Sequence, residues 1–145
     1  DSMMDFIVSE DMVKKYGIVR QGVKTQTELI IKYGLNMVFG TDMATNKYFC
    51  EENQLKAFSA FGERFGSFEG LRSATGRAHD LFKLSTYRNP YPEGKLGVLE
   101  EGSFADLLIV DGNPVENLEL LTDKANMRVI MKDGVVYKNT LEESR

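Results

Sequence analysis

The sequence predicts an α/β fold that gives way to short β-strands near residue 85. Two observations support this expectation. Apolar residues at helical spacing fill much of residues 9–84 and surround a short apolar run at residues 35–40, which is typical of helices packed on a parallel strand. Beyond residue 85, prolines and brief apolar runs between turn residues are typical of strands and hairpins. We therefore expect two parts, residues 1–84 and 85–145.

Two helices are expected before the apolar run. Ser9 has the side chain of an N-cap, and acidic residues follow it in the first turn of a short helix that Gly17 interrupts. A longer helix is predicted from Val19 to about Tyr33, with a lysine in its last turn. Gly34 follows as the residue that ends this helix in the left-handed conformation.

The apolar run at residues 35–40 is predicted to be a buried parallel strand, because it is apolar on both faces and ends at a glycine. Such a strand would deliver the carboxylate of Asp42 to the carboxyl end of a sheet, where α/β folds place their chemistry. An aspartate after a strand is also a common helix cap or turn former, so Asp42 alone does not decide between the two roles. A loop over residues 43–49 is expected next.

Two further helices are predicted, at residues 51–61 and from Ser67 to about Leu84, with a break at residues 62–66. The single histidine, His79, lies in the second of them, and a lone histidine lacks the partners that a metal site requires. We therefore expect a structural or surface role for His79. The single cysteine, Cys50, cannot form an internal disulfide, which favours a reducing compartment and a cytoplasmic location.

The second part is predicted to contain short strands connected by turns. The expected strands lie at residues 95–99, 105–110, 127–131 and 135–138. Asp133 and Gly134 form a two-residue hairpin signal between the last two strands. A tight turn is expected at residues 111–114, and one helical turn at residues 118–121.

Composition limits the class of protein. With 145 residues, 42% hydrophobic and 28% charged, the sequence is that of one ordinary globular domain. The net charge is −4 and the basic residues are scattered, so nucleic-acid binding is not expected. No apolar run approaches the ~20 residues that cross a bilayer, so no membrane span is expected either.

Three stretches together resemble the C-terminal portion of amidohydrolase-superfamily enzymes. Val38–Asp42 resembles the end of the last barrel strand, and Glu69–Thr75 resembles the family helix written EALRAAT. Leu96–Pro114, followed by Val129–Gly134, is close to the family pattern LGxIxxGxxADLxxxDGNP…VMKDG and is the most specific of the three. The resemblance is closest to prolidases, or Xaa-Pro dipeptidases, and to the imidazolonepropionase-like group.

The resemblance implies a (β/α)8 TIM barrel with one or two divalent metal ions, zinc by default, and a small β-sandwich built from both chain ends. Residues 1–84 would then contain the last barrel strand and helices, and residues 85–145 the C-terminal strands of the sandwich. It also implies that Asp42 binds metal and takes a proton from the attacking water, in a hydrolase of amide or dipeptide bonds. Asp106 and Asp111 would be structural.

The other family ligands are absent from this sequence, which lacks the His-x-His pair, the bridging lysine or glutamate and the two later histidines. The fold would be incomplete, since a closed barrel needs eight strands. Either the chain is part of a longer enzyme, or it is a non-catalytic scaffold that lost the metal site. A strand that is apolar on both faces favours the first alternative, because it needs neighbours on both edges. The expected partners are the missing N-terminal portion, a small peptide or amide substrate and a second copy of the chain. The 145 residues alone are expected to be inactive.

Overall fold

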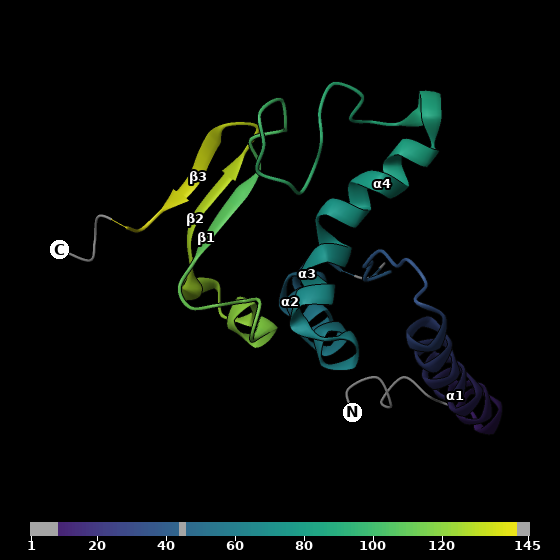
Figure 1. Cartoon of the computed structure of the whole chain (residues 1–145). Helices are drawn as coiled ribbons and strands as arrows, with labels where there is room; N and C mark the ends of the chain where they lie inside the picture. Colours follow the sequence, from purple (N-terminus) through teal and green to yellow (C-terminus); the bar gives the residue numbers. More distant parts are fainter. Residues whose placement is uncertain (1–8, 44–45, 142–145) are drawn as a thin grey trace. The chain divides into compact units, whose positions relative to one another are not determined.

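The computed structural model describes residues 9–43 and 46–141 (Figure 1). The chain forms two compact units, Asp1–Asn36 and Met37–Arg145. Within the described residues, the first unit contains one long helix, and the second contains three helices, three short 3-10 helices and a three-stranded sheet. None of the helices within the described ranges is both long enough and apolar enough to span a membrane.

Helix α1 (Glu10–Tyr33) begins and ends where the sequence predicts. The Ser9 hydroxyl accepts a hydrogen bond from the Met12 amide at 3.3 Å, and Gly34 adopts a left-handed conformation with φ of 58°. The break predicted at Gly17 is wrong, because the helix continues through this residue. An interior glycine costs a helix only about 1 kcal/mol, which 24 residues of helical hydrogen bonding tolerate.

The strand predicted at residues 35–40 is not formed in this structure, and residues 35–43 have no regular secondary structure. A strand exists only where a neighbouring strand completes its hydrogen bonds, and the described residues provide none on either edge. The Phe39 amide instead donates a hydrogen bond to the Ser73 carbonyl at 3.1 Å. This stretch is therefore a connecting segment that is tied to a helix.

Helix α2 (Lys47–Phe65) starts earlier than predicted. The side chain of Asn46 accepts a hydrogen bond from the Phe49 amide at 3.0 Å and so caps the first turn. The helix therefore occupies the second half of the loop expected at residues 43–49, while residues 44–45 lie outside the described ranges.

The break predicted at residues 62–66 shrinks to Gly66, which has a φ of 89° and separates α2 from α3 (Ser67–Ala74). A second break, which the sequence did not indicate, lies at Thr75, where α4 (Gly76–Leu84) begins. Gly97 packs directly against this break. A β-carbon at Gly97 would lie 2.3 Å from the Thr75 carbonyl carbon, so only glycine permits this approach.

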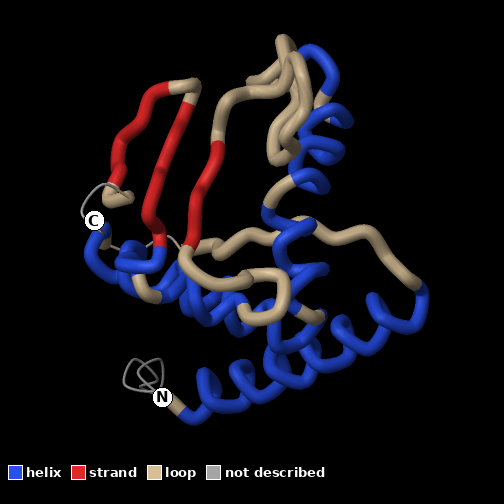
Figure 2. The backbone as a smooth tube through the Cα atoms, turned by 60° about the vertical axis from the view of Figure 1, so that its left-hand side comes forward, coloured by secondary structure: helices blue, strands red, loops and turns tan. Residues whose placement is uncertain are grey.

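The sheet is antiparallel, with strand order β1-β2-β3, and Figure 2 shows the three strands side by side. Its members are β1 (Leu107–Val110), β2 (Met127–Lys132) and β3 (Val135–Asn139). Asp133 and Gly134 have φ values of 50° and 75°, as a two-residue hairpin requires, so the predicted hairpin is confirmed.

The prediction of a strand at residues 95–99 is wrong, because this region contains only one isolated bridge, between Lys95 and Ser103. A single bridge leaves most backbone groups of the stretch without ladder partners, so no strand forms. Short 3-10 helices complete the connections, and η3 (Leu118–Thr122) matches the helical turn expected there. Elsewhere in the described part of the chain, 3-10 helices lie at η2 (Thr86–Arg88) and η4 (Lys124–Asn126).

The core of the second unit joins helix, connection and sheet. Phe58 from α2, Leu118 and Leu121 from the 3-10 helix η3 and Met127 from β2 form one buried cluster. Leu118 is only 2% exposed and packs against two glycines of neighbouring helices, Gly62 and Gly70. The connection after β1 is thereby fixed to the place where α2 and α3 meet.

We expect Gly62→Ala to destabilise the protein by about 1–3 kcal/mol, the usual cost of overpacking a core. The new β-carbon would lie 2.5 Å from Leu118 Cδ1 and 3.2 Å from Cγ, so a change of leucine rotamer alone does not relieve the contact. The matched control is Gly17→Ala in α1, where no atom lies within 4 Å and a gain of up to about 1 kcal/mol is expected. Urea unfolding of both variants measures the difference. Equal stabilities for the two variants would contradict the packing described for Leu118.

Candidate functional site

Asp42 lies at the end of the connecting segment with an exposed side chain. Its φ of 50° places it in the left-handed region, which aspartate tolerates better than most residues. Among the described residues, none makes a hydrogen bond or an ion pair with the Asp42 carboxylate. A solvated carboxylate in such a place can accept a proton or bind a cation.

The described residues contain no group of three or more His, Cys, Asp and Glu side chains that could hold a metal ion. Asp42 could supply one carboxylate ligand, which is the oxygen chemistry that zinc and harder cations accept. A complete ligand set would need residues beyond those described. The site predicted at Asp42 therefore remains a prediction, and no second side chain of the described residues joins it.

His79 and Cys50 have local contacts. The Leu96 amide donates to Nδ1 of His79 at 3.4 Å, which connects α4 to the loop that follows Gly94. Cys50 is half-buried, and its sulfur lies 3.7 Å from the Met43 carbonyl oxygen. The structural role expected for His79 agrees with its contact.

Asp106 and the hairpin turn are joined by hydrogen bonds. Oδ1 of Asp106 accepts from the Asp133 amide at 2.8 Å, and the neighbouring Ala105 carbonyl accepts from the Gly134 amide at 3.0 Å. The structural role predicted for Asp106 is thus confirmed, although its partner was not foreseen. Residues 105–107 and 132–134 are therefore directly connected: the first stretch supplies the two acceptors, and the second supplies the two backbone amides that donate to them.

Asp111 also has a structural role, as predicted. Its amide donates to the Asn126 carbonyl at 2.8 Å, and its carboxylate lies 3.5 Å from Arg128. The turn that follows is closed by Asn113, whose side chain accepts from the Val115 amide at 3.1 Å. These contacts position the chain between β1 and η3.

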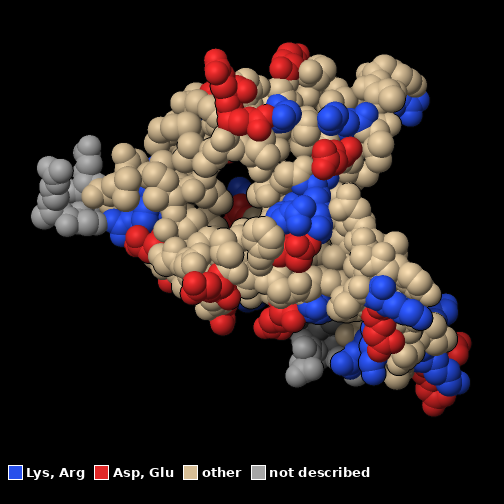
Figure 3. Space-filling view, in the orientation of Figure 1, with Lys and Arg blue, Asp and Glu red and all other residues tan. Residues whose placement is uncertain are grey.

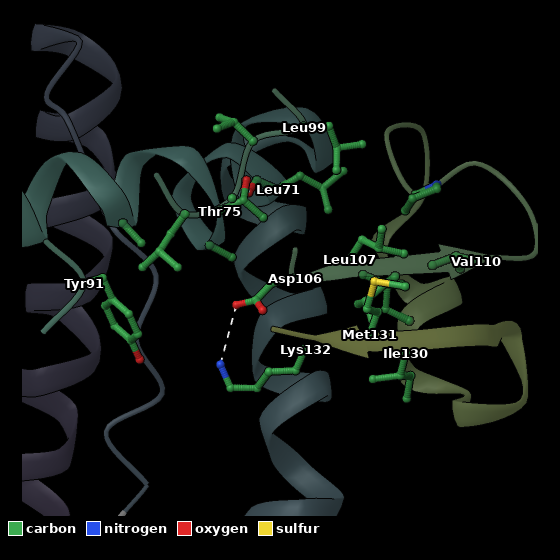
Figure 4. Close-up of a pocket in the computed structure, with 18 of the residues that line it drawn as sticks. Leu71, Thr75, Tyr91, Leu99, Asp106, Leu107, Val110, Ile130, Met131 and Lys132 are labelled. Carbon is green, nitrogen blue, oxygen red and sulfur yellow. Dashed lines mark hydrogen bonds and ion pairs between the residues drawn. The ribbon is translucent and has the colours of Figure 1, made fainter. Parts of the chain in front are cut away.

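A groove of about 710 Å³ lies between helices α3 and α4 and the sheet, and we call it the sheet–helix groove (Figure 4). Most of its surface is aliphatic or aromatic. Its lining includes Leu71, Thr75, Ala78, Phe82, Tyr91, Val98, Leu107, Val110, Ile130 and Met131. Asp42 does not line it, so the groove and the candidate catalytic carboxylate are separate features.

One charged pair lies in this groove. Lys132 Nζ is 3.6 Å from Asp106 and 3.6 Å from Asp133, and Figure 4 shows the lysine beside Asp106. The carboxylates of Asp106 and then Asp133 raise the pKa of the Lys132 ammonium above its usual value of 10.5. Elsewhere, acidic and basic side chains are interspersed on the face shown in Figure 3, and no large area of one sign is visible there.

No protein-family model matches this chain, and no curated protein matches it significantly. Solved structures do. An uncharacterized protein has a TM-score of 0.72 and 28% identity, with 94% of this chain covered. A prolidase complexed with N-methylphosphonate-L-proline has a TM-score of 0.70 and 27% identity over the same share. An amidohydrolase has a TM-score of 0.65 and 27% identity, with 81% of this chain covered.

The chain spans only 26–31% of the length of these structures. Its structural neighbours are thus amidohydrolase-family proteins, and it corresponds to less than a third of each. The mixture of helices and a small antiparallel sheet matches that portion of them.

We expect Asp106→Ala to lower the free energy of unfolding by about 0.5–1.5 kcal/mol, the usual net contribution of one hydrogen bond, because the Asp133 amide loses its protein acceptor. Asp111→Ala is the matched control. Its carboxylate is 61% exposed and 3.5 Å from Arg128, and such a pair contributes at most about 1 kcal/mol. Urea unfolding at neutral pH compares the two variants. A larger loss in Asp111→Ala would contradict the role given to Asp106.

Because of Lys132, we expect the free energy of unfolding to fall as the pH rises in the alkaline range. Its pKa is raised in the folded chain, so its contribution is complete below 10.5 and disappears as the pH rises through the folded pKa. Asp106→Asn removes the largest cause of the shift. Between about pH 9 and pH 12, this variant should therefore lose less stability than the unaltered protein, as followed by urea unfolding. An identical alkaline decline in both proteins would show that the pair has no such effect.

Proposed function

We propose that this chain is the C-terminal part of a metal-dependent amidohydrolase that hydrolyses a C–N bond in a small amide, most specifically a dipeptide. The observation that carries the proposal is the similarity to an amidohydrolase and a prolidase, with TM-scores of 0.65 and 0.70 at 27% identity. Residues 1–84 would belong to the catalytic barrel and residues 85–145 to the accompanying sandwich. A cytoplasmic location fits the single half-buried cysteine.

In this proposal, Asp42 is the reactive residue that the chain contributes. Its carboxylate would be one ligand of the ion and would accept the proton of the attacking water. A divalent cation, zinc by default, lowers the pKa of water toward neutrality when it is bound. The exposure of Asp42 supports these roles, since the carboxylate is accessible to ligands and substrate. The remaining ligands would come from the N-terminal portion of the enzyme.

A dipeptide that ends in proline is the substrate class we favour. One neighbouring prolidase was solved with N-methylphosphonate-L-proline, which carries a phosphonate on the proline nitrogen. A tetrahedral phosphonate resembles the transition state of amide hydrolysis, and enzymes bind such groups tightly. The side chains that select the substrate would lie on loops outside this chain.

The N-terminal portion of the same enzyme would cover the apolar surfaces that the chain exposes. Ile18, Val19 and Ile31 of α1 are 60–72% exposed, and the sheet–helix groove is lined mostly by apolar residues. Exposed apolar area of this extent is typical of a surface that is buried in the complete protein. A second copy of the enzyme would complete a homo-oligomer.

The test uses the full-length enzyme with an Xaa-Pro dipeptide as substrate. Asp42→Asn should lower kcat by about 10²–10⁴-fold, the range typical of a lost general base. The matched control is Asp80→Asn on α4, an exposed aspartate outside the candidate site, which should leave kcat unchanged. Metal analysis of the same preparation should find a stoichiometric divalent ion.

The opposite result would be equally informative. Full activity in Asp42→Asn would exclude this residue as ligand and base. A full-length protein without hydrolytic activity and without a metal ion would favour a scaffold that has lost its chemistry.

A further inference from the structure

A carboxylate that binds an ion and accepts a proton must be held to within a fraction of an ångström. Asp42 receives no hydrogen bond from the described residues, and its side chain is exposed. Its position therefore depends on the backbone that carries it. Because three residues span at most about 10 Å, an anchor a few positions upstream can restrict where Asp42 lies.

Phe39, three positions before Asp42, has the contacts of such an anchor. Its ring centroid lies 4.9 Å from that of Phe58 in a tilted arrangement and 5.3 Å from that of Phe61 in an edge arrangement. Both geometries are favourable for aromatic pairs. Its amide donates to the Ser73 carbonyl at 3.1 Å. Side chain and backbone of Phe39 are thus both held, one by α2 and the other by α3.

The groups that hold Phe39 are themselves fixed. Phe58 is 8% exposed and belongs to the buried cluster that includes Leu118 and Met127. Ser73 is completely buried, and its hydroxyl donates to the Glu69 carbonyl at 2.7 Å within α3. The anchor is therefore continuous with the core that joins the helices to the sheet.

We infer that Phe39 is a positioning residue for Asp42: its ring between Phe58 and Phe61 and its amide on Ser73 fix the backbone from which the carboxylate projects. This role rests on the proposed function, in which Asp42 is a ligand and base. The left-handed backbone of Asp42 fits it, because a sparsely populated conformation persists only where the surrounding structure imposes it.

Phe65 provides a matched control. It is half-buried, and its ring centroid lies 4.8 Å from that of Phe61. The four rings connected by such contacts, which we call the aromatic row, are those of Phe39, Phe58, Phe61 and Phe65. Phe65 is not among the rings that contact Phe39. Replacing Phe65 by leucine removes similar apolar contact but leaves both rings that contact Phe39 in place.

The experiment compares Phe39→Leu with Phe65→Leu in the full-length enzyme, first by hydrogen exchange. We expect the backbone amide of residue 39 to exchange about tenfold faster in Phe39→Leu, because the ring contacts that protect its hydrogen bond to the Ser73 carbonyl are lost. Phe65→Leu should leave exchange of this amide unchanged. This readout requires neither metal nor turnover, so it remains interpretable if Asp42 proves unimportant for activity.

Kinetics on the same proteins test the link to chemistry. Phe39→Leu should lower kcat by about tenfold to a hundredfold, the effect of misplacing a reacting group, while KM stays within about twofold. Phe65→Leu should retain kcat even if its melting temperature falls equally. Affinity for zinc, measured by chelator competition, should fall in Phe39→Leu and not in Phe65→Leu.

Two results would overturn the inference. One is unchanged exchange of the residue 39 amide in Phe39→Leu, and the other is an equal loss of kcat in both variants, which would indicate packing alone. If Phe39→Leu does not fold, Phe61→Leu removes the edge contact from the opposite side and is tested by the same readouts. Full activity in Asp42→Asn, with faster exchange in Phe39→Leu, would refute the role proposed for Asp42 as ligand and base and leave the anchor as a structural feature.

Discussion

The arrangement of the second unit depends on one contact, the insertion of Leu118 against Gly62 and Gly70. Leu118 can approach both helices there only because neither glycine carries a β-carbon, and this leucine is 2% exposed. Through Leu118, the connection after β1 is bound to the helices. The sheet, the aromatic row and the segment that carries Asp42 all take their positions from this junction.

The same unit contains carboxylates with and without interaction partners among the described residues. Asp106 is engaged by the Asp133 amide and Lys132, and Asp111 by Arg128, so each serves the sheet and its turns. Asp42 has no such partner among the described residues. A carboxylate used to hold a turn has little capacity left for a ligand. This contrast, together with the similarity to amidohydrolase-family structures, directs attention to Asp42.

Local features were predictable from the sequence, whereas features with distant causes were not. Ser9, Gly34 and the Asp133–Gly134 turn act through neighbouring atoms, so each was identified from its immediate surroundings. The apolar run at residues 35–40 was expected to be a strand, but its hydrogen-bond partners are not among the described residues. The break at Thr75 escaped prediction because it faces Gly97, 22 positions later in the sequence. At the candidate site, the position of Asp42 directly after the apolar run could be identified from the sequence. The contacts of Phe39 could not, because they are made by helices that follow it in the chain.

The left-handed backbone at Asp42 also limits which acid could stand in that position. Glutamate offers the same functional group, and on chemical grounds alone it would serve as well. Aspartate and asparagine adopt a positive φ more readily, because their short polar side chains can form hydrogen bonds with the nearby backbone. The longer glutamate side chain is less suited to this. Of the residues that this backbone accommodates readily, glycine and asparagine carry no negative charge. The conformation of the main chain therefore favours aspartate over glutamate at this position before any demand of catalysis is considered.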